Sequence, residues 1–284
     1  MTLREALKQG IGELRAANVG SPALAAELLL MHVLGCARAR LYTRISDPID
    51  PAALERYRQL VGCRAAGTPT QYLTGTQEFW SLEFEVTPDV LIPRPETEHV
   101  VEVALERVGW RRLAERLRVV DVGTGAGCLA VALAHELPEA RVFAVDISRR
   151  ALAVASRNAA RNGAGDRIAF VEGNLLAPFA ARAFNLAAVN PPYVGRRDAA
   201  SLPREVREHE PAEALFAGEE GIEIYPLLVA QAAERLVPGG TLVMELGYGA
   251  SARVQALMDP AEWRNVAITN DLAGIPRVLA ADRA

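Results

Sequence analysis

The sequence is poor in cysteine and has no long apolar run, and these absences exclude several classes of protein. Its three cysteines are far apart and odd in number, so neither a disulfide framework nor a paired-cysteine metal site is supported. The longest apolar run, residues 23–37, contains Glu27 and His32, which make it too short and too polar to cross a bilayer. We therefore expect structural cysteines, no bound metal and no membrane partner.

A secretion signal and a basic surplus are also missing. The first residues, Met1–Glu5, lack the apolar stretch of a signal peptide, which favours a cytoplasmic protein. The net charge is −4, and the excess of seven acidic side chains beyond residue 75 contrasts with an excess of three basic ones before it. Proteins that bind phosphate backbones usually carry a strongly positive face. No direct nucleic-acid partner is expected.

The composition is that of an ordinary globular protein, with half of the residues hydrophobic. The length of 284 residues favours two domains. Residues 1–75 read as a small helical domain. Leu3, Leu7, Ile11 and Leu14 recur at helical spacing. Further helices are predicted from Ser21-Pro22 to Gly35 and from Asp50-Pro51 to Gly67, because proline is favoured just after a capping residue.

Residues 76–97 are predicted to be a linker that contains a hairpin and a proline-rich stretch. Residues 79–86 alternate apolar and polar side chains enough to form a strand. Residues 91–97 contain too much proline for regular structure.

Residues 98–284 alternate short apolar runs with helical segments, which is typical of an α/β domain. Strands are expected at residues 118–122, 142–145, 168–171, 186–189 and 241–245, with two more near 265–269 and 277–280. Helices are expected at residues 126–136, 149–162 and 222–236. This pattern predicts a mostly parallel, seven-stranded sheet covered on both faces.

A glycine-rich turn follows the first of these strands, in the run Asp121-Val122-Gly123-Thr124-Gly125-Ala126-Gly127. Glycines there let the backbone approach a ligand at the N-terminus of the next helix. Asp146 ends the second strand, where its carboxylate can accept hydrogen bonds from both hydroxyls of a ribose. The two features together predict a nucleotide site.

The spacing of this loop separates two kinds of nucleotide enzyme. Dehydrogenases carry Gly-x-Gly-x-x-Gly, whereas here the third glycine comes one residue early and Asp121 precedes the loop. The loop resembles that of class I methyltransferases, in which an acidic strand end helps to position the aminoacyl part of S-adenosylmethionine. That resemblance also places Asn174 and Leu175, after the third strand, beside the adenine, with Asn174 where an aspartate is usual.

The tetrapeptide Asn190-Pro191-Pro192-Tyr193 directly follows the fourth strand. Two prolines hold the chain extended and remove two N–H donors, which leaves the Asn190 side chain and the Pro191 carbonyl as fixed acceptors. Such a pair suits an –NH₂ group, whose lone pair it would aim at the methyl donor. Tyr193 would pack against the planar group and offer its π-face to the cationic centre.

Over nearly its whole length the chain resembles the release-factor glutamine methyltransferase family (PrmC/HemK). The segments that carry the resemblance are Phe79-Trp80, residues 90–98, the glycine loop, the tetrapeptide, Glu210–Leu215, and Asp271–Gly274 with Arg277. The resemblance implies a Rossmann-like methyltransferase domain, S-adenosylmethionine as donor, and class I peptide chain release factors as partners. Their Gly-Gly-Gln glutamine would be the methyl acceptor, and residues 1–75 would dock the protein substrate.

Two departures from the family pattern stand out, Asn174 for the usual aspartate and Gly247-Tyr248-Gly249-Ala250, where relatives often have a glutamine after the glycine. Two alternatives stay open from the residues themselves. One is an amino methyltransferase acting on a nucleic-acid base, which the acidic balance of residues 76–284 disfavours. The other is a non-catalytic adenosine-binding module, which would give no reason for Asn190 and its prolines.

Overall fold

The computed structural model describes residues 1–109 and 116–284, which form two compact units. The first comprises Met1–Thr76 together with Pro203–His209, and the second comprises Gln77–Leu202 together with Glu210–Ala284. The linker residues 77–97 therefore belong to the second unit. Within the described ranges no helix has the length and apolar character needed to span a membrane.

The first unit is helical, and the three helices expected there are confirmed. Its elements are α1 (Leu3–Ala16), α2 (Pro22–Leu34), α3 (Arg38–Thr43), α4 (Pro51–Ala65), α5 (Thr70–Thr74) and α10 (Arg204–His209). A capping box between Thr2 and Glu5 starts α1, because it satisfies two backbone N–H groups that the first turn leaves free. The core of the unit is built around Leu14, Leu29 and Tyr57, all fully buried.

Helix α10 was not expected in this unit, because it lies far along the chain, between the two stretches that form the second unit. The buried Arg64 guanidinium of α4 forms an ion pair with Glu205 of α10. A segment in the middle of the second unit therefore completes the first.

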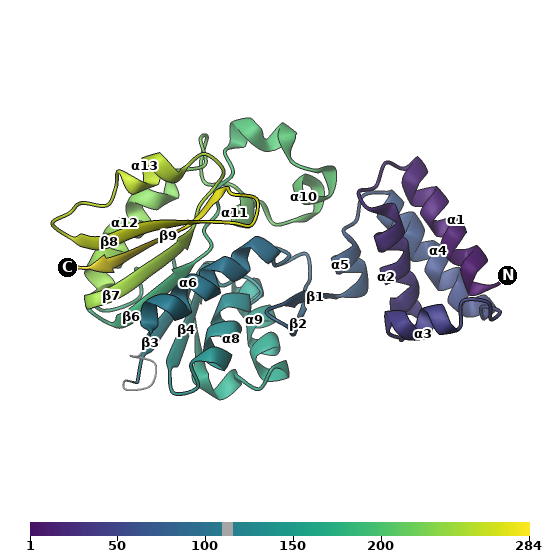
Figure 1. The fold of residues 1–284 in the computed structure, drawn as a ribbon, viewed down its shortest axis with the longest axis horizontal. Helices are drawn as coiled ribbons and strands as arrows, with labels where there is room; N and C mark the ends of the chain where they lie inside the picture. Colours follow the sequence, from purple (N-terminus) through teal and green to yellow (C-terminus); the bar gives the residue numbers. More distant parts are fainter. Residues whose placement is uncertain (110–115) are drawn as a thin grey trace. The chain divides into compact units, whose positions relative to one another are not determined.

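The second unit contains a seven-stranded sheet in the order β5-β4-β3-β6-β7-β9-β8 (Figure 1). The strands are β3 (Arg118–Val122), β4 (Arg141–Asp146), β5 (Ile168–Glu172), β6 (Phe184–Val189), β7 (Leu236–Glu245), β8 (Trp263–Asn270) and β9 (Pro276–Arg283). All neighbours run parallel except β9, which is antiparallel to both β7 and β8. The predicted sheet is confirmed, and its seven strands lie within a few residues of the expected ranges.

Helices cover both faces of this sheet. One face packs against α6 (Glu98–Val108), α8 (Cys128–Glu136) and α9 (Arg149–Arg161), and the other against α12 (Ile224–Arg235) and α13 (Ser251–Gln255). Shorter elements are η1 (Pro95–Thr97), η2 (Gly165–Arg167), η3 (Arg196–Ser201) and α11 (Ala212–Leu215). From β3 the chain winds out to β5 and then returns to β6 on the other side of β3. That reversal creates a crevice at the carboxyl ends of β3 and β6, where ligands bind in such folds.

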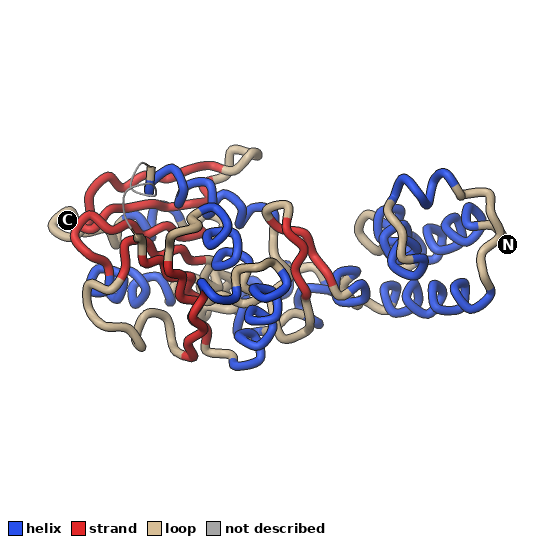
Figure 2. Tube along the Cα trace, turned by 90° about the horizontal axis from the view of Figure 1, so that it is seen from below, coloured by secondary structure: helices blue, strands red, loops and turns tan. Residues whose placement is uncertain are grey.

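The linker contains the hairpin expected there, but the single strand expected over residues 79–86 is interrupted. The segment forms a hairpin of β1 (Thr76–Phe79) and β2 (Leu82–Glu85), drawn as a separate pair of red strands in Figure 2. The chain reverses at Trp80 and Ser81, which both have left-handed φ values, 54° and 57°. Two-residue hairpin turns need this geometry to match the twist of their strands. Without glycine or asparagine at the turn, the alternation alone did not locate the reversal at Trp80 and Ser81.

Candidate active site

A pocket lies at the crevice, where β3, β4, β5 and β6 end. Residues from the linker and from the segment around α11 complete its wall. The predicted site residues that line it are Asp121, Gly123, Thr124, Gly125, Ala126, Asp146, Asn174, Leu175, Asn190 and Pro192. Gly127, Pro191 and Tyr193, also predicted for the site, are not among its lining residues.

The glycine loop follows β3 and runs into the start of α8. Gly123, Gly125 and Gly127 have φ values of 72°, 53° and 84°, a backbone conformation that residues with a Cβ rarely adopt. A Cβ at Gly127 would lie only 3.0 Å from the Cβ of Ala155 in α9. Gly127 therefore lets α8 and α9 pack closely, while the two earlier glycines shape the pocket floor.

Asp121 is a buried carboxylate with one committed oxygen and one free oxygen. Its Oδ2 accepts hydrogen bonds from the Thr124 hydroxyl at 2.6 Å and from the Ala130 backbone N–H at 3.0 Å. Its Oδ1 is buried and has no hydrogen-bond partner in the described part of the chain. Burial raises the pKa of Asp121 to about 7, against the lowering effect of these two donors. A cationic group in the pocket would give Oδ1 the partner it lacks.

Asp146 ends β4 and holds two pieces of backbone. Its Oδ2 accepts from the Gly125 N–H and its Oδ1 from the Ser148 N–H, each at 2.9 Å. Burial raises the pKa of this carboxyl, and the two backbone donors oppose that rise. A carboxylate has about four acceptor positions, so Asp146 can brace the glycine loop and still accept from ligand hydroxyls.

Asn174 and Leu175 follow β5, where the chain turns sharply. Leu175 has a left-handed φ of 51°, and a Cβ at the preceding Gly173 would meet the ring of Pro178 at 2.0 Å. The tightness of this turn brings all three residues, Gly173 to Leu175, into the pocket lining.

The tetrapeptide leaves β6 beside a buried polar chain. The Asn190 side-chain N–H donates to the Thr97 hydroxyl at 3.0 Å, and Thr97 donates in turn to Glu245 Oε2 at 2.7 Å. The Tyr193 hydroxyl donates to Glu245 Oε1 at 3.1 Å. Pro191 is buried. The structure thus ties Tyr193 to β7 by its hydroxyl, and a Cβ at Gly247 would lie only 3.1 Å from the Cβ of Tyr193, a tight contact.

Sequence reasoning missed Thr97 and Glu245 as members of this site. Both are buried, at 1% exposed each. One signal was available, because Glu245 places a charged residue at the end of an otherwise apolar strand. Charged residues are almost never buried unless they are paired.

The linker forms one wall of the pocket through Asp89, Val90, Leu91, Pro93 and Thr97. This wall is anchored at two points. In one of them the Arg94 guanidinium pairs with the buried Glu210, which also accepts from the Ile92 N–H at 3.3 Å. The proline-rich segment therefore has a defined place beside the glycine loop.

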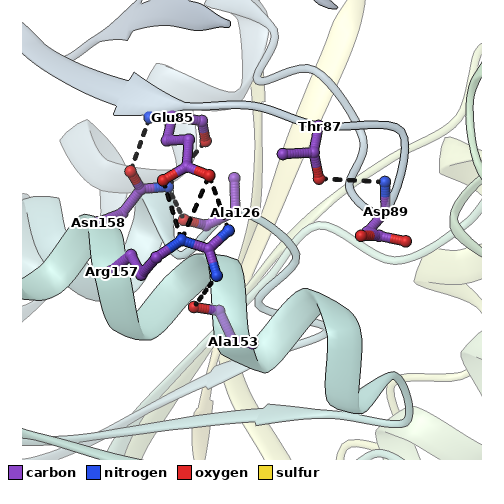
Figure 3. A network of polar contacts seen from close by, with 7 residues as sticks. All are labelled: Glu85, Thr87, Asp89, Ala126, Ala153, Arg157 and Asn158. Carbon is purple, nitrogen blue, oxygen red and sulfur yellow. Dashed lines mark hydrogen bonds and ion pairs between the residues drawn. The ribbon is translucent and has the colours of Figure 1, made fainter.

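The second anchor joins β2 to α9 (Figure 3). The fully buried Asn158 side chain accepts from the Glu85 N–H at 2.6 Å and donates to the Glu85 carbonyl at 2.9 Å. Its second N–H donates to the Ala126 carbonyl in the glycine loop at 2.8 Å. On the outside Arg157 forms an ion pair with the Glu85 carboxylate. One asparagine thus holds the hairpin, helix α9 and the glycine loop together.

No group of three or more histidine, cysteine or acidic side chains is arranged to hold a metal ion in residues 1–109 and 116–284.

Comparison with known proteins adds two family models, the PrmC N-terminal domain over residues 5–75 and the methyltransferase small domain over residues 108–206. A release factor glutamine methyltransferase of Koribacter versatilis is 44% identical over 280 residues, covering 98% of each chain. One of Moorella thermoacetica is 44% identical over 287 residues, covering 100% of this chain and 99% of that one.

Among solved structures, the hMettl16 catalytic domain in complex with the MAT2A 3′UTR hairpin 6 aligns with a TM-score of 0.57 at 18% identity, covering 78% of this chain and 81% of that one. A methyltransferase from Pyrococcus furiosus aligns with a TM-score of 0.50 at 16% identity, covering 72% and 90%. At such identities these two structures support the fold alone.

Proposed function

The chain belongs to the release factor glutamine methyltransferase family, and on this basis we propose that it methylates class I peptide chain release factors. The methyl group would pass from S-adenosylmethionine to the side-chain amide nitrogen of the glutamine in their Gly-Gly-Gln motif. The observation that carries the proposal is that Asn190, at the head of the tetrapeptide, lines the same pocket as Asp121 and Asp146.

The residues of the pocket fit the methyl donor. The free Oδ1 of Asp121 would accept from the donor's ammonium group, and Asp146 would accept from the ribose hydroxyls. Asn174 and Leu175 would border the adenine, with the Asn174 amide oxygen accepting from its amino group. When bound, S-adenosylmethionine supplies an electrophilic methyl group on a sulfonium.

The tetrapeptide would hold the acceptor. An amide nitrogen is a poor nucleophile because its lone pair is delocalised into the carbonyl. Acceptance of its two hydrogens by the Asn190 side-chain oxygen and the Pro191 carbonyl would orient the nitrogen for in-line attack. Pro191 and Pro192 have no N–H of their own to compete. The Tyr193 ring would pack beside the amide plane while its hydroxyl stays on Glu245.

The helical unit, which carries no nucleotide motif, is proposed to dock the release factor. Because release factors act in translation, the proposed site of action is the cytoplasm. A nucleic-acid substrate is not favoured, since residues 76–284 carry an excess of seven acidic side chains.

A direct test uses labelled S-adenosylmethionine with purified release factor, tRNA and DNA in parallel reactions. Label should appear in the release factor and disappear when the Gly-Gly-Gln glutamine is changed to alanine. Label in tRNA or DNA, with the release factor unlabelled, would overturn the proposal. Mass spectrometry of the modified peptide then shows whether the methyl group lies on the glutamine side chain.

A further inference from the structure

A buried chain of three side chains ends at the amide of Asn190. The Asn190 Nδ2 lies 3.0 Å from the Thr97 Oγ1, which lies 2.7 Å from Glu245 Oε2. Glu245 and Thr97 are each 1% exposed, so bulk water does not offer them alternative partners. Residues from η1, β7 and the end of β6 meet here, far apart in the sequence.

The direction of these hydrogen bonds follows from the number of hydrogens available. A hydroxyl has one hydrogen to donate. In Thr97 that hydrogen is donated to the ionised Glu245 carboxylate at 2.7 Å, because an ionised carboxylate can only accept. The Thr97 oxygen can then only accept, so it must face the –NH₂ end of the Asn190 amide. The oxygen of that amide is left facing the other way.

We propose that Thr97 and Glu245 are positioning residues, which fix the orientation of the Asn190 amide so that its oxygen, not its –NH₂, faces the methyl acceptor. This inference rests on the proposed function, in which the methyl acceptor is the –NH₂ group of a glutamine. That group donates hydrogen bonds, so it needs the oxygen of the Asn190 amide facing it. With the amide reversed, two –NH₂ groups would face each other. The acceptor would then be misaligned even though every residue of the tetrapeptide is present.

Protonation of Glu245 would reverse the chain. A Glu245 that carries its proton on Oε2 donates to the Thr97 oxygen, Thr97 then donates its own hydrogen to the Asn190 amide oxygen, and the amide must turn over. Burial raises the pKa of Glu245, while its hydrogen bonds from Thr97 and Tyr193 and the charge of Arg277 lower it. The charged and titratable groups around it are Glu96 before Thr97, Cys128 in α8, Tyr193 after β6, Tyr225 in α12 and Arg277 in β9. Arg277 is itself paired with Asp271.

The test compares Thr97→Val, which keeps the shape and removes the hydroxyl, with Thr97→Ser, which keeps the hydroxyl. With release factor as substrate and S-adenosylmethionine at saturation, Thr97→Val should lower kcat by about 10- to 100-fold. The KM for release factor and the affinity for donor should stay within about twofold of wild type, because the polar side chains assigned to the donor are those of Asp121, Asp146 and Asn174, and Val keeps the shape of the Thr97 side chain in the pocket wall. Thr97→Ser should retain most of the wild-type kcat.

The pH profile distinguishes an orientation role from a packing role. In wild type and Thr97→Ser, kcat at saturating donor should fall on the acid side, where Glu245 gains its proton. In Thr97→Val the fall in kcat on the acid side should be absent. Without the Thr97 hydroxyl, no hydrogen bond links Glu245 to Asn190, so protonation of Glu245 cannot change the orientation of the Asn190 amide. A Thr97→Val enzyme with wild-type kcat, or with the same fall on the acid side, would overturn the inference.

A readout without turnover comes from protein labelled with ¹⁵N-asparagine, in which the Asn190 side-chain signal is assigned by its loss in Asn190→Asp. One of its amide hydrogens should exchange slowly in wild type and in Thr97→Ser but not in a folded Thr97→Val. Equal exchange in all three would contradict the proposed hydrogen bond. If wild type itself fails to methylate release factor, the proposed function is wrong, whereas an active wild type with an unaffected Thr97→Val refutes this inference alone.

Discussion

Donor binding should depend on pH through Asp121, because this carboxyl is buried and titrates near neutrality. Its pKa is raised to about 7 by burial, and its Oδ1 has no partner among the described residues. If the donor's ammonium group becomes that partner, the pocket binds the donor when Asp121 is ionised. Below the pKa, binding must first remove a proton, so affinity falls as the pH falls.

The size of the effect follows from the two titrations. With a pKa of about 7, Asp121 is about 9% ionised at pH 6.0 and about 76% at pH 7.5. An α-amino group with a pKa of roughly 7.8 is about 98% and about 67% protonated at the same two values. The product of the fractions predicts an association constant about sixfold larger at pH 7.5 than at pH 6.0. At pH 6.5 binding should release roughly 0.7 proton.

Titration calorimetry of S-adenosylmethionine from pH 6.0 to 7.5, in two buffers of different ionisation enthalpy, measures both quantities. Asp121→Asn keeps the size of the side chain and removes the titration. It should bind the donor about 10- to 100-fold more weakly at pH 7.5, the usual loss of a hydrogen bond to a charged group, and its affinity should change little with pH. A flat profile in wild type, or the same sixfold change in Asp121→Asn, would show that the ammonium group does not bind at Asp121.

Four further outcomes are expected. Asn190→Ala should bind donor normally by calorimetry yet lose at least ~10²-fold in methylation rate with release factor, because one preorganised hydrogen bond is removed; a wild-type rate would remove Asn190 from the site. Asn174→Asp should tighten donor binding, since a charged acceptor makes a stronger hydrogen bond, and unchanged or weaker affinity would refute its contact with the adenine amino group. Asn158→Leu should cost about 3 kcal/mol in urea unfolding, because the buried Ala126 carbonyl and two partly buried backbone groups of Glu85 lose their partner, whereas the exposed Arg157→Gln should cost less than about 1 kcal/mol; equal losses would contradict the anchoring role of Asn158. Deletion of residues 1–75 should spare donor affinity but lower kcat/KM for intact release factor, and full efficiency in a truncated enzyme shown to be folded would end the docking role.

Much of the fold was predictable because it depends on local pattern. Asp121, Asp146 and Asn190 each lie at the end of a strand, and these strands are short apolar runs in the sequence. Because the strands are parallel, their ends lie at one edge of the sheet. The glycine loop was recognisable for the same reason, since its conformation is a property of neighbouring residues.

The parts that could not be predicted depend on contacts between distant residues. Thr97 and Glu245 are separated by 148 positions, and their hydrogen bond exists only because η1 lies over the end of β7. Neither the free Oδ1 of Asp121 nor the three hydrogen bonds of Asn158 has a sequence signature. A hairpin was expected in the linker, but its turn could not be placed at Trp80, because the left-handed turn there contains no residue type that favours it.

The passage of α10 into the first unit has a consequence for synthesis on the ribosome. A chain that emerges from its amino terminus can form α1, α2 and α4 early, but the unit that they belong to stays incomplete until residue 209 has been made. The Arg64 guanidinium, which is buried in the finished unit, meets the carboxylate of Glu205 only after 141 further residues (205 − 64) have been added. Domains usually fold as units in the order of their synthesis. Here the two units cannot be completed one after the other. Most of the β-strands around the pocket leave the ribosome before α10, the last helix of the helical unit, has been made.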